Sequence, residues 1–367
     1  MNRLIIIGNG FDLSLGLRTG YKHFLFDYFL NSIRECFSSD SDTVDLDNRG
    51  YKYQDNLIKI SIPESWNQEY TEAKLREICD YNGLVDVLNE YDMITSQFDL
   101  LTKILQLDAE YSWIDLEVMY YDQLVKISQL KSLSNRDKQI SLHNARFSEL
   151  KDRLIQYIAK IDSGFHPDSY LSFSHHYTEP FFNPHPKSQQ SGGINAVQIL
   201  NFNYTTVLES TVLQFGKSDY QNVRLNYIHG EVRNPKSIIF GFGDEHDKNY
   251  QALESERNSE LFRNIKSAHY FRNSAYKILN GFINADLYEV FIIGHSCGIS
   301  DRTLLNEIFE HENCDSVRIF HRKIESGDDF LDKSIEIMRH FKDKVGMRNK
   351  ICEFYEGDEI IQYVAKS

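Results

Sequence analysis

Short apolar runs alternate with longer mixed segments at both ends of the chain. The first run, Leu4–Ile7, is unbroken and ends at a glycine, which is typical of a strand buried on both faces of a parallel sheet. Similar runs return after residue 192 and predict strands at 197–200, 223–228, 237–240, 288–293, 316–320 and 351–355. Helical patterns separate them at 260–282, 302–311 and 330–341. Strands alternating with helices indicate a parallel α/β sheet.

The middle of the chain has a helical pattern instead. Apolar residues recur at three- and four-residue steps at 98–107, at 114–127 and from Phe147 onward. The first strand must pair with the later ones, because a lone buried strand cannot satisfy its backbone. We therefore predict an α/β, Rossmann-like parallel sheet with helices on both faces, built from residues 1–30 and 192–367. A large, mainly helical insertion at 31–191 would interrupt it.

Composition limits the classes of partner. The 367 residues include 40 basic and 54 acidic ones, a net charge of −14, and form no basic block, so duplex nucleic acid is not expected as a partner. The five cysteines are scattered, which argues against a disulfide framework or a zinc module and fits a reducing compartment. No apolar run approaches the length of a membrane span or a signal-peptide core. We expect a cytoplasmic protein without a membrane partner.

The first strand leads directly into Gly8, Asn9, Gly10, Phe11 and Asp12. Glycines at this point let the backbone approach a pyrophosphate, and ligands of parallel sheets bind beyond the carboxyl ends of strands. The third glycine of the dehydrogenase G-x-G-x-x-G fingerprint is absent. The alternative interpretation is a tight turn with Asp12 as a helix cap.

Two further polar motifs follow predicted strands. Asn203 and Tyr204 lie in N-F-N-Y-T-T after the second strand, where an amide could orient a sugar hydroxyl or a water; a side-chain-stabilised turn is the alternative. His229 lies in I-H-G-E after the third strand, where a histidine can act as a general base or be purely structural.

The segment Gly294, His295, Ser296, Cys297 and Gly298 matches G-x-S-x-G, the nucleophile elbow of α/β hydrolases. This match supports a rival function, a serine hydrolase that uses Ser296. Its acid and histidine partners would come from Asp315, Asp329, His321 and His340. The rival leaves the glycine turn without a role, and it ignores Ser300 and Asp301, which are typical of the start of a helix. Cys297 could be reactive in this turn, although a small space-filling residue is the simpler interpretation.

Taken together, the ordered motifs resemble the AbiH-type abortive-infection family, which is implicated in defence against bacteriophage. The series is G-N-G-F-D-L, N-F-N-Y-T-T-V-L-E, I-H-G-E, F-G-F-G-D-E and G-H-S-C-G-I-S-D, within residues 1–25 and 197–305. That family is more distantly similar to the sirtuin-type NAD-binding fold. The resemblance implies that Asn203, Tyr204 and His229 match an Asn-Tyr and His-Gly signature, and that Gly294 and Ser296 match a ribose-binding segment. Two departures are Asp12 in the glycine turn and the missing four-cysteine module, which makes protein deacylation improbable.

The resemblance implies an antiviral effector that binds NAD as its substrate and hydrolyses it, with no metal expected. Asn203 would position a water or a ribose hydroxyl, and His229 would be the base. The residues that would bind the nucleotide are Gly8, Asn9, Gly10, Phe11, Asp12, Tyr204, Gly294, His295, Ser296 and Asp301.

Several alternatives stay open beside the serine hydrolase. One is a nucleotide sensor without turnover. Another is a metal-dependent nuclease whose candidate ligands are Asp12, Asp244, Glu245 and Asp301. His175, His176 and His185 are interpreted as loop residues rather than metal ligands. The helical middle could bind a phage-derived trigger or a second copy of the chain.

Overall fold

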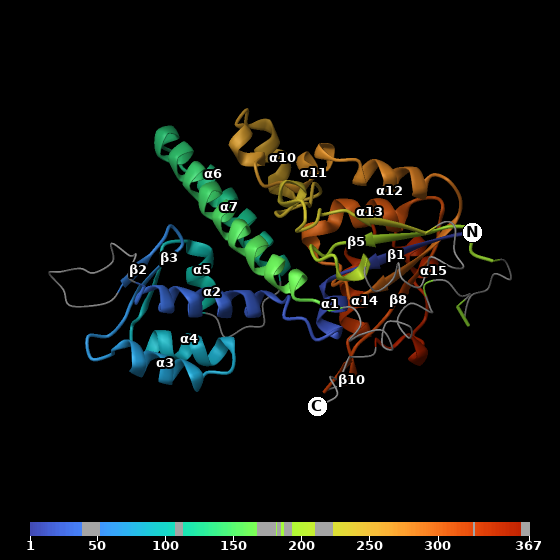
Figure 1. Ribbon diagram of the computed structural model, residues 1–367. Coiled ribbons are helices and arrows are strands. Elements are labelled where there is room, and N and C mark those ends of the chain that lie inside the picture. The colour runs from blue at the N-terminus through green and yellow to red at the C-terminus, as the bar shows by residue number, and fades with distance from the viewer. Residues whose placement is uncertain are drawn as a thin grey trace. The chain divides into compact units, whose positions relative to one another are not determined.

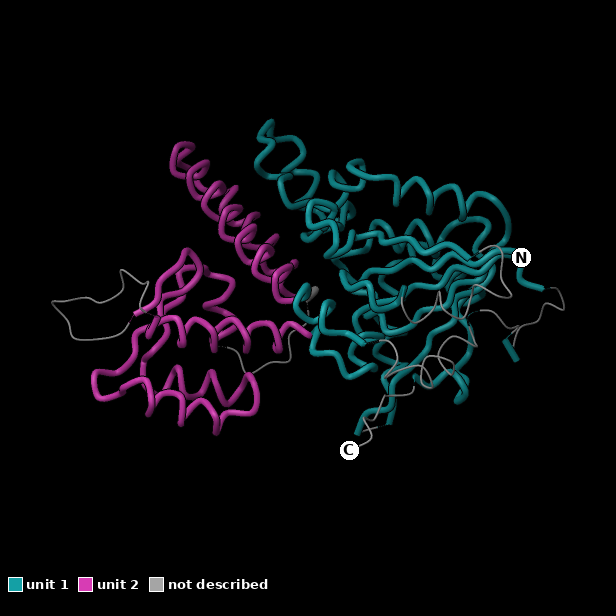
Figure 2. Tube along the Cα trace, in the orientation of Figure 1, with its two compact units in different colours: residues 1–19, 158–367 teal, residues 20–157 magenta. Residues whose placement is uncertain are grey.

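The protein divides into two compact units, formed by residues 1–19 with 158–367 and by residues 20–157 (Figure 2). We call them unit 1 and unit 2. The computed structural model describes residues 1–38, 52–106, 113–166, 181, 185–186, 193–209, 223–325 and 327–360. The boundaries of unit 2 lie at other residues than the 31–191 proposed for the insertion. Residues 20–30 belong to unit 2, whereas residues from Ile158 onward belong to unit 1.

Unit 1 contains a five-stranded parallel sheet in the order β6-β5-β1-β7-β8 (Figure 1). Its strands are β1 (Asn2–Ile7), β5 (Val197–Asn201), β6 (Val223–Tyr227), β7 (Tyr288–Ile293) and β8 (Cys314–Ile319). The prediction of a parallel α/β sheet is confirmed, and the order is compatible with a Rossmann-like arrangement. From β1 the chain adds strands on one side and then returns to add β7 and β8 on the other. Ligands of such sheets bind at this reversal, beyond the carboxyl ends.

Helices flank both faces of the sheet, and the side chains of β1 are therefore buried on both sides. Leu4 and Ile6 pack on one side in a core with α12 (Ala275–Ile283) and α13 (Arg302–Glu310). Ile5 and Ile7 pack on the other side in a core that includes Phe11 of α1 (Asn9–Ser14). Each fully buried aliphatic side chain contributes roughly 1.5–3 kcal/mol, so the apolar run that predicted the strand also fixes its central place.

Two predicted strands are wrong. Residues 237–240 form no strand, because Ile239 N–H donates to the carbonyl of His229 and the segment follows the loop after β6. Residues 351–355 contribute a single bridge, from Ile351 to Val317 at the edge of β8. The predicted helix at 260–282 is broken into η3 (Ser259–Phe262), α11 (Lys266–His269), η4 (Tyr270–Arg272) and α12. The other elements of unit 1 are η2 (Pro235–Ser237), α10 (Lys248–Ser255), η5 (Ile299–Asp301), β9 (Lys323–Ile324), β10 (Gly327–Asp328), α14 (Phe330–Met338), α15 (Lys344–Lys350) and η6 (Glu356–Asp358).

Unit 2 is mainly helical but also holds a small antiparallel sheet that sequence reasoning missed. The helices are α2 (Tyr21–Glu35), α3 (Gln68–Arg76), α4 (Tyr81–Glu90), α5 (Asp99–Gln106), α6 (Trp113–Ser128) and most of α7 (Leu133–Ser163). The sheet has the order β2-β3-β4, with β2 (Lys52–Gln54), β3 (Ile58–Ser61) and β4 (Ile94–Ser96). Strands of three or four residues carry too short an alternation to stand out from the sequence.

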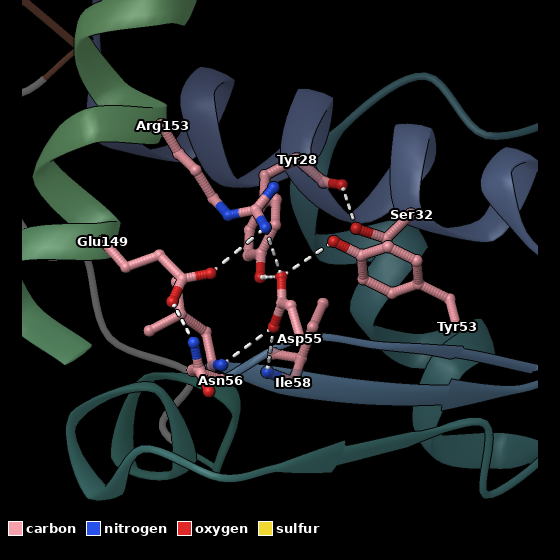
Figure 3. A network of polar contacts seen from close by, with 9 residues as sticks. Tyr28, Ser32, Tyr53, Asp55, Asn56, Ile58, Glu149 and Arg153 are labelled. Carbon is pink, nitrogen blue, oxygen red and sulfur yellow. Dashed lines mark hydrogen bonds and ion pairs between the residues drawn. The ribbon is translucent and has the colours of Figure 1, made fainter. Parts of the chain in front are cut away.

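The largely buried carboxylate of Asp55 joins three parts of unit 2 (Figure 3). Asp55 accepts hydrogen bonds from the hydroxyls of Tyr28 (2.6 Å) and Tyr53 (2.8 Å) and pairs with the guanidinium of Arg153 (2.7 Å). The N–H of Ile58 also donates to Asp55, at 2.8 Å. The guanidinium lies 4.9 Å from the centre of the Tyr28 ring. Asp55 thus connects α2, the β2–β3 turn and α7.

Across the described residues, no helix is both long and apolar enough to span a bilayer.

Candidate functional site

The turns after β1 and β7 pack backbone against backbone. The N–H of Gly8 donates to the carbonyl of Ile293 (3.1 Å), and that of Gly10 donates to the carbonyl of Gly294 (2.8 Å). A Cβ on Gly8 would lie 2.6 Å from His295 Cα, and one on Gly10 would lie 2.7 Å from Gly294 Cα. Gly294 itself has a φ of +66°, which favours glycine. The two amides serve this packing, so a phosphate bound here would need other donors.

A buried carboxyl joins the first two motifs. Asp12 is 1% exposed and accepts hydrogen bonds from Thr205 Oγ1 (2.7 Å) and Asn203 Nδ2 (3.1 Å). Asn203 Nδ2 also donates to the carbonyl of Gly8 (3.1 Å). Burial, with a smaller contribution from nearby Asp162, raises the pKa of Asp12 to about 7 against the effect of the two hydrogen bonds. Asp12 lies within α1 and not at its N-cap, so the helix-cap interpretation is wrong.

His229 follows β6 in a buried position. Its Nε2 lies 3.3 Å from Asp301 Oδ1 and 3.3 Å from the hydroxyl of Tyr270. Its ring meets the Phe202 ring edge-on, with the centroids 4.9 Å apart. Burial lowers the pKa of His229, and the ammonium of Lys266 adds to that shift, whereas Asp301 opposes it. The imidazole is therefore neutral near pH 7 and able to accept a proton.

Asp301 stands at the centre of a second polar group. Its Oδ1 accepts a hydrogen bond from Lys266 Nζ (2.7 Å), and its Oδ2 lies 3.9 Å from His295 Nε2. Burial opposes ionisation of Asp301, but Lys266 and His229 prevail and lower its pKa. His295 Nδ1 accepts the N–H of Cys297 (3.0 Å), and burial lowers the pKa of His295 to about 4. Asp301 of the charged pair thus faces two imidazoles that are neutral near pH 7.

Sequence reasoning missed Lys266, which is 1% exposed. Its N–H donates to the carbonyl of Phe242 (2.9 Å), within the F-G-F-G-D-E motif. A Cβ on Gly241 would lie 2.0 Å from the carbonyl oxygen of Asn264, and one on Gly243 would lie 2.7 Å from that of Ser300. The motif therefore lies close against both the segment before Lys266 and the residue before Asp301. The motif was noticed only through the resemblance, and nothing in the local sequence marks the lysine itself.

The four motifs that follow β1, β5, β6 and β7 adjoin one another at the carboxyl ends of these strands. The Phe202 ring contacts both His229 and His295, the latter with centroids 4.2 Å apart, while Gly8 packs on His295 and binds Asn203. The structure thus brings together residues that are up to about 290 positions apart in sequence, from Gly8 to Asp301.

Other proposed ligand residues serve different contacts. Asn9 accepts a hydrogen bond from Thr19 Oγ1 (2.6 Å), and Tyr204 donates to the carbonyl of Ile239 (3.1 Å). Phe11 is a core residue, and Ser296 is exposed. These contacts of Asn9 and Tyr204 lie outside the polar cluster around Asp301.

The turn after β7 gives the serine hydrolase little support. No described residue forms a hydrogen bond with the Ser296 side chain, and the non-glycine residue of this turn in the left-handed region is Cys297 (φ +53°) rather than Ser296. His340 Nε2 lies 2.6 Å from the carbonyl of Cys297, while Asp329 pairs with Lys333. Burial also raises the pKa of the Cys297 thiol, so this cysteine fills space and is not activated as a nucleophile.

The carboxylates named for a nuclease are bound to different partners. Asp12 binds Asn203 and Thr205, Asp301 binds Lys266, and Asp244 lies 3.3 Å from a guanidinium nitrogen of Arg302. Within the ranges that the structure describes, no three His, Cys, Asp or Glu residues are grouped as metal ligands. His185 is buried and pairs with Asp358 at 2.8 Å, whereas His175 and His176 lie outside the described residues.

A cavity of about 480 Å³ lies beside the loop after β5. Thr206 and Asp162 line it, and the N–H of Thr206 donates to Asp162 (2.6 Å). Adjacent threonines therefore hold two carboxyls, because Thr205 binds Asp12 and Thr206 binds Asp162. The cavity shares this loop with Asn203.

Fold and site together define an α/β protein whose polar side chains gather at the carboxyl edge of a parallel sheet, where the strand order reverses. The model of the family described as "Bacteriophage abortive infection AbiH" matches residues 4–322. The chain belongs to the AbiH family, as its motifs indicated, and membership suggests a role in abortive infection by bacteriophage. A comparison with curated proteins finds no match.

Proposed function

We propose that this protein is an abortive-infection effector that hydrolyses the nicotinamide–ribose bond of NAD at the carboxyl edge of a sirtuin-like, Rossmann-type sheet. The observation that carries the proposal is the convergence of Asn203 and His229 at the strand reversal. Asn203 binds Gly8 and Asp12, and His229 contacts Phe202 and Asp301. The resemblance of these motifs to sirtuin-like NAD-consuming proteins is the reason for proposing NAD as the substrate.

The chemistry asks little of the protein. Nicotinamide leaves as a neutral molecule from a pyridinium, so the departing nitrogen keeps the electron pair of the broken bond and needs no general acid. The transition state is oxocarbenium-like, as in glycoside cleavage. Water oxygen then bonds to the ribose C1′ and gives its proton to a base. His229 can be that base because it is neutral near pH 7, and such a group contributes about 10²–10⁴-fold.

Asn203 would orient the water or a ribose hydroxyl through its carbonyl oxygen. Both hydrogens of its amide are directed at protein acceptors, the carbonyl of Gly8 and the carboxyl of Asp12. Among the described residues none donates to Oδ1 of Asn203, so this atom is the one left for substrate. The same two contacts hold the amide in one orientation.

The test is conversion of NAD to nicotinamide and ADP-ribose, measured by mass spectrometry with purified protein and in infected cells. His229→Ala should reduce the rate by about 10²–10⁴-fold. His246→Ala, a change of the same kind at an exposed histidine, should leave it unchanged. If the wild-type protein leaves NAD intact in both settings, the proposal fails.

A nucleotide sensor without turnover is the second candidate. Asp12, His229 and Asp301 are each at most 5% exposed, and that degree of burial also suits a binding module. Such a sensor would raise its melting temperature with NAD and release no nicotinamide.

A further inference from the structure

The ion pair of Lys266 and Asp301 is almost completely buried. Lys266 is 1% exposed and Asp301 5%. Removing two charges from water is costly, and well-packed apolar residues often serve stability as well or better. The pair also lies against a residue that carries out the proposed reaction, because Asp301 Oδ1 is 3.3 Å from His229 Nε2. This placement suggests a role in the site.

We propose that Asp301 and Lys266 are positioning residues for His229. The carboxylate accepts the Nε2 hydrogen of the imidazole, which leaves Nδ1 to take the proton from the attacking water, and the ammonium balances the charge of the carboxylate. The role of Nδ1 rests on the proposed function. The arrangement of hydrogens on His229 does not depend on it.

The tautomer follows from the hydrogen-bonding capacity of each group. An ionised carboxylate only accepts, so a neutral imidazole with Nε2 facing Asp301 carries its hydrogen on Nε2. The neighbouring His295 reaches the same tautomer by another route, since its Nδ1 accepts the N–H of Cys297 and its Nε2 faces Asp301. His229 is thus held by the carboxylate, and His295 by the backbone.

The lysine has a separate task. A buried carboxylate alone would draw a proton onto His229 and remove its basic lone pair near neutral pH. Lys266 Nζ lies 2.7 Å from the same oxygen that faces His229 and offsets this attraction. Among the described residues, the charged or titratable groups around His229 are Asp301, Lys266, Tyr270 and His295. Only the first two carry opposite full charges at neutral pH, so they can be tested against each other.

The test is nuclear magnetic resonance of the full chain with ¹⁵N-labelled histidine, titrated without NAD. Wild-type His229 should carry its hydrogen on Nε2. Lys266→Met should raise the titration midpoint of His229 by about one pH unit or more, and Asp301→Asn should lower it. Lys266→Arg keeps the charge and should leave both the tautomer and the midpoint close to wild type. A pair without electrostatic contact with His229 would leave the midpoint and the tautomer unchanged in all three variants.

The double variant Lys266→Met with Asp301→Asn keeps the test decisive where a single variant fails to fold, because no unpaired charge is left buried. The titration midpoint of His229 in the double variant should be close to the wild-type value. It should therefore lie above that of Asp301→Asn and below that of Lys266→Met, where those variants fold. A hydrogen on Nδ1 in the wild type, or shifts of the same sign in the two single variants, would overturn the proposal. If these signals are as expected but no variant or wild-type protein cleaves NAD, the proposed function fails and the positioning pair stands.

Discussion

Asp12→Asn offers a quantitative test of the buried carboxyl that joins the first two motifs. Burial raises the pKa of Asp12 from 3.8 to about 7, roughly three units at 1.36 kcal/mol each, or about 4 kcal/mol. Because the pKa is higher in the folded state, its contribution to stability is complete below pH 3.8 and is lost as pH rises through 7. Asparagine does not titrate. The free energy of unfolding of the variant, relative to wild type, should therefore increase by about 4 kcal/mol between pH 4 and pH 8.

The difference in the free energy of unfolding between Asp12→Asn and wild type is more informative than the pH profile of either protein. His295 titrates in the opposite sense, since burial lowers its pKa to about 4 and its contribution is lost as pH falls below about 6.5. Both proteins contain His295, so its effect cancels in the difference. Both tryptophans, Trp66 and Trp113, lie in unit 2, so fluorescence would not report on the sheet. Hydrogen exchange of β1 and β5 peptides in urea, corrected for intrinsic rates, measures the relevant opening.

Asp86→Asn, at an exposed position on α4, is the control for the chemical change from carboxyl to amide. A pH-independent difference for Asp12→Asn would show that Asp12 is solvated. It would refute the reasoning from burial.

Two further predictions concern packing in each unit. Gly10→Ala should lower stability by about 1–3 kcal/mol, because the new Cβ would meet the backbone of Gly294 at 2.7 Å. The matched variant Gly281→Ala on α12 places its Cβ where nothing lies within 4 Å and should raise stability by about 1 kcal/mol. Equal melting temperatures for the two variants would contradict this prediction. Asp55→Ala should destabilise unit 2 by about 3 kcal/mol or more, because it leaves several donors without their acceptor, and Trp66 fluorescence during urea unfolding would reveal a normal midpoint if the network were dispensable.

The sheet could be predicted because its strands appear in the sequence as short, mainly apolar segments separated by longer mixed ones. Leu4–Ile7 is apolar at every position, and only a central strand with two covered faces explains that pattern. The segment 351–355 is interrupted by Glu353 and forms one bridge at the edge of β8. Whether such a segment becomes a strand depends on how far it can pair with its neighbour in the folded chain, which the local sequence does not contain.

The candidate site was accessible from sequence only in part. Asn203 and His229 follow strands, so the common edge of a parallel sheet predicts that they lie near each other. Lys266 follows no strand and belongs to no recognised motif. It reaches Asp301 because a neighbouring loop packs by close glycine contacts, an arrangement that depends on tertiary structure.

The most direct measurement of the central claim is the reaction of purified protein with NAD in H₂¹⁸O, followed by mass spectrometry. The account predicts unlabelled nicotinamide together with ADP-ribose that carries one ¹⁸O atom, and loss of both products with His229→Ala. Release of AMP and nicotinamide mononucleotide, or products that persist unchanged with His229→Ala, would contradict it.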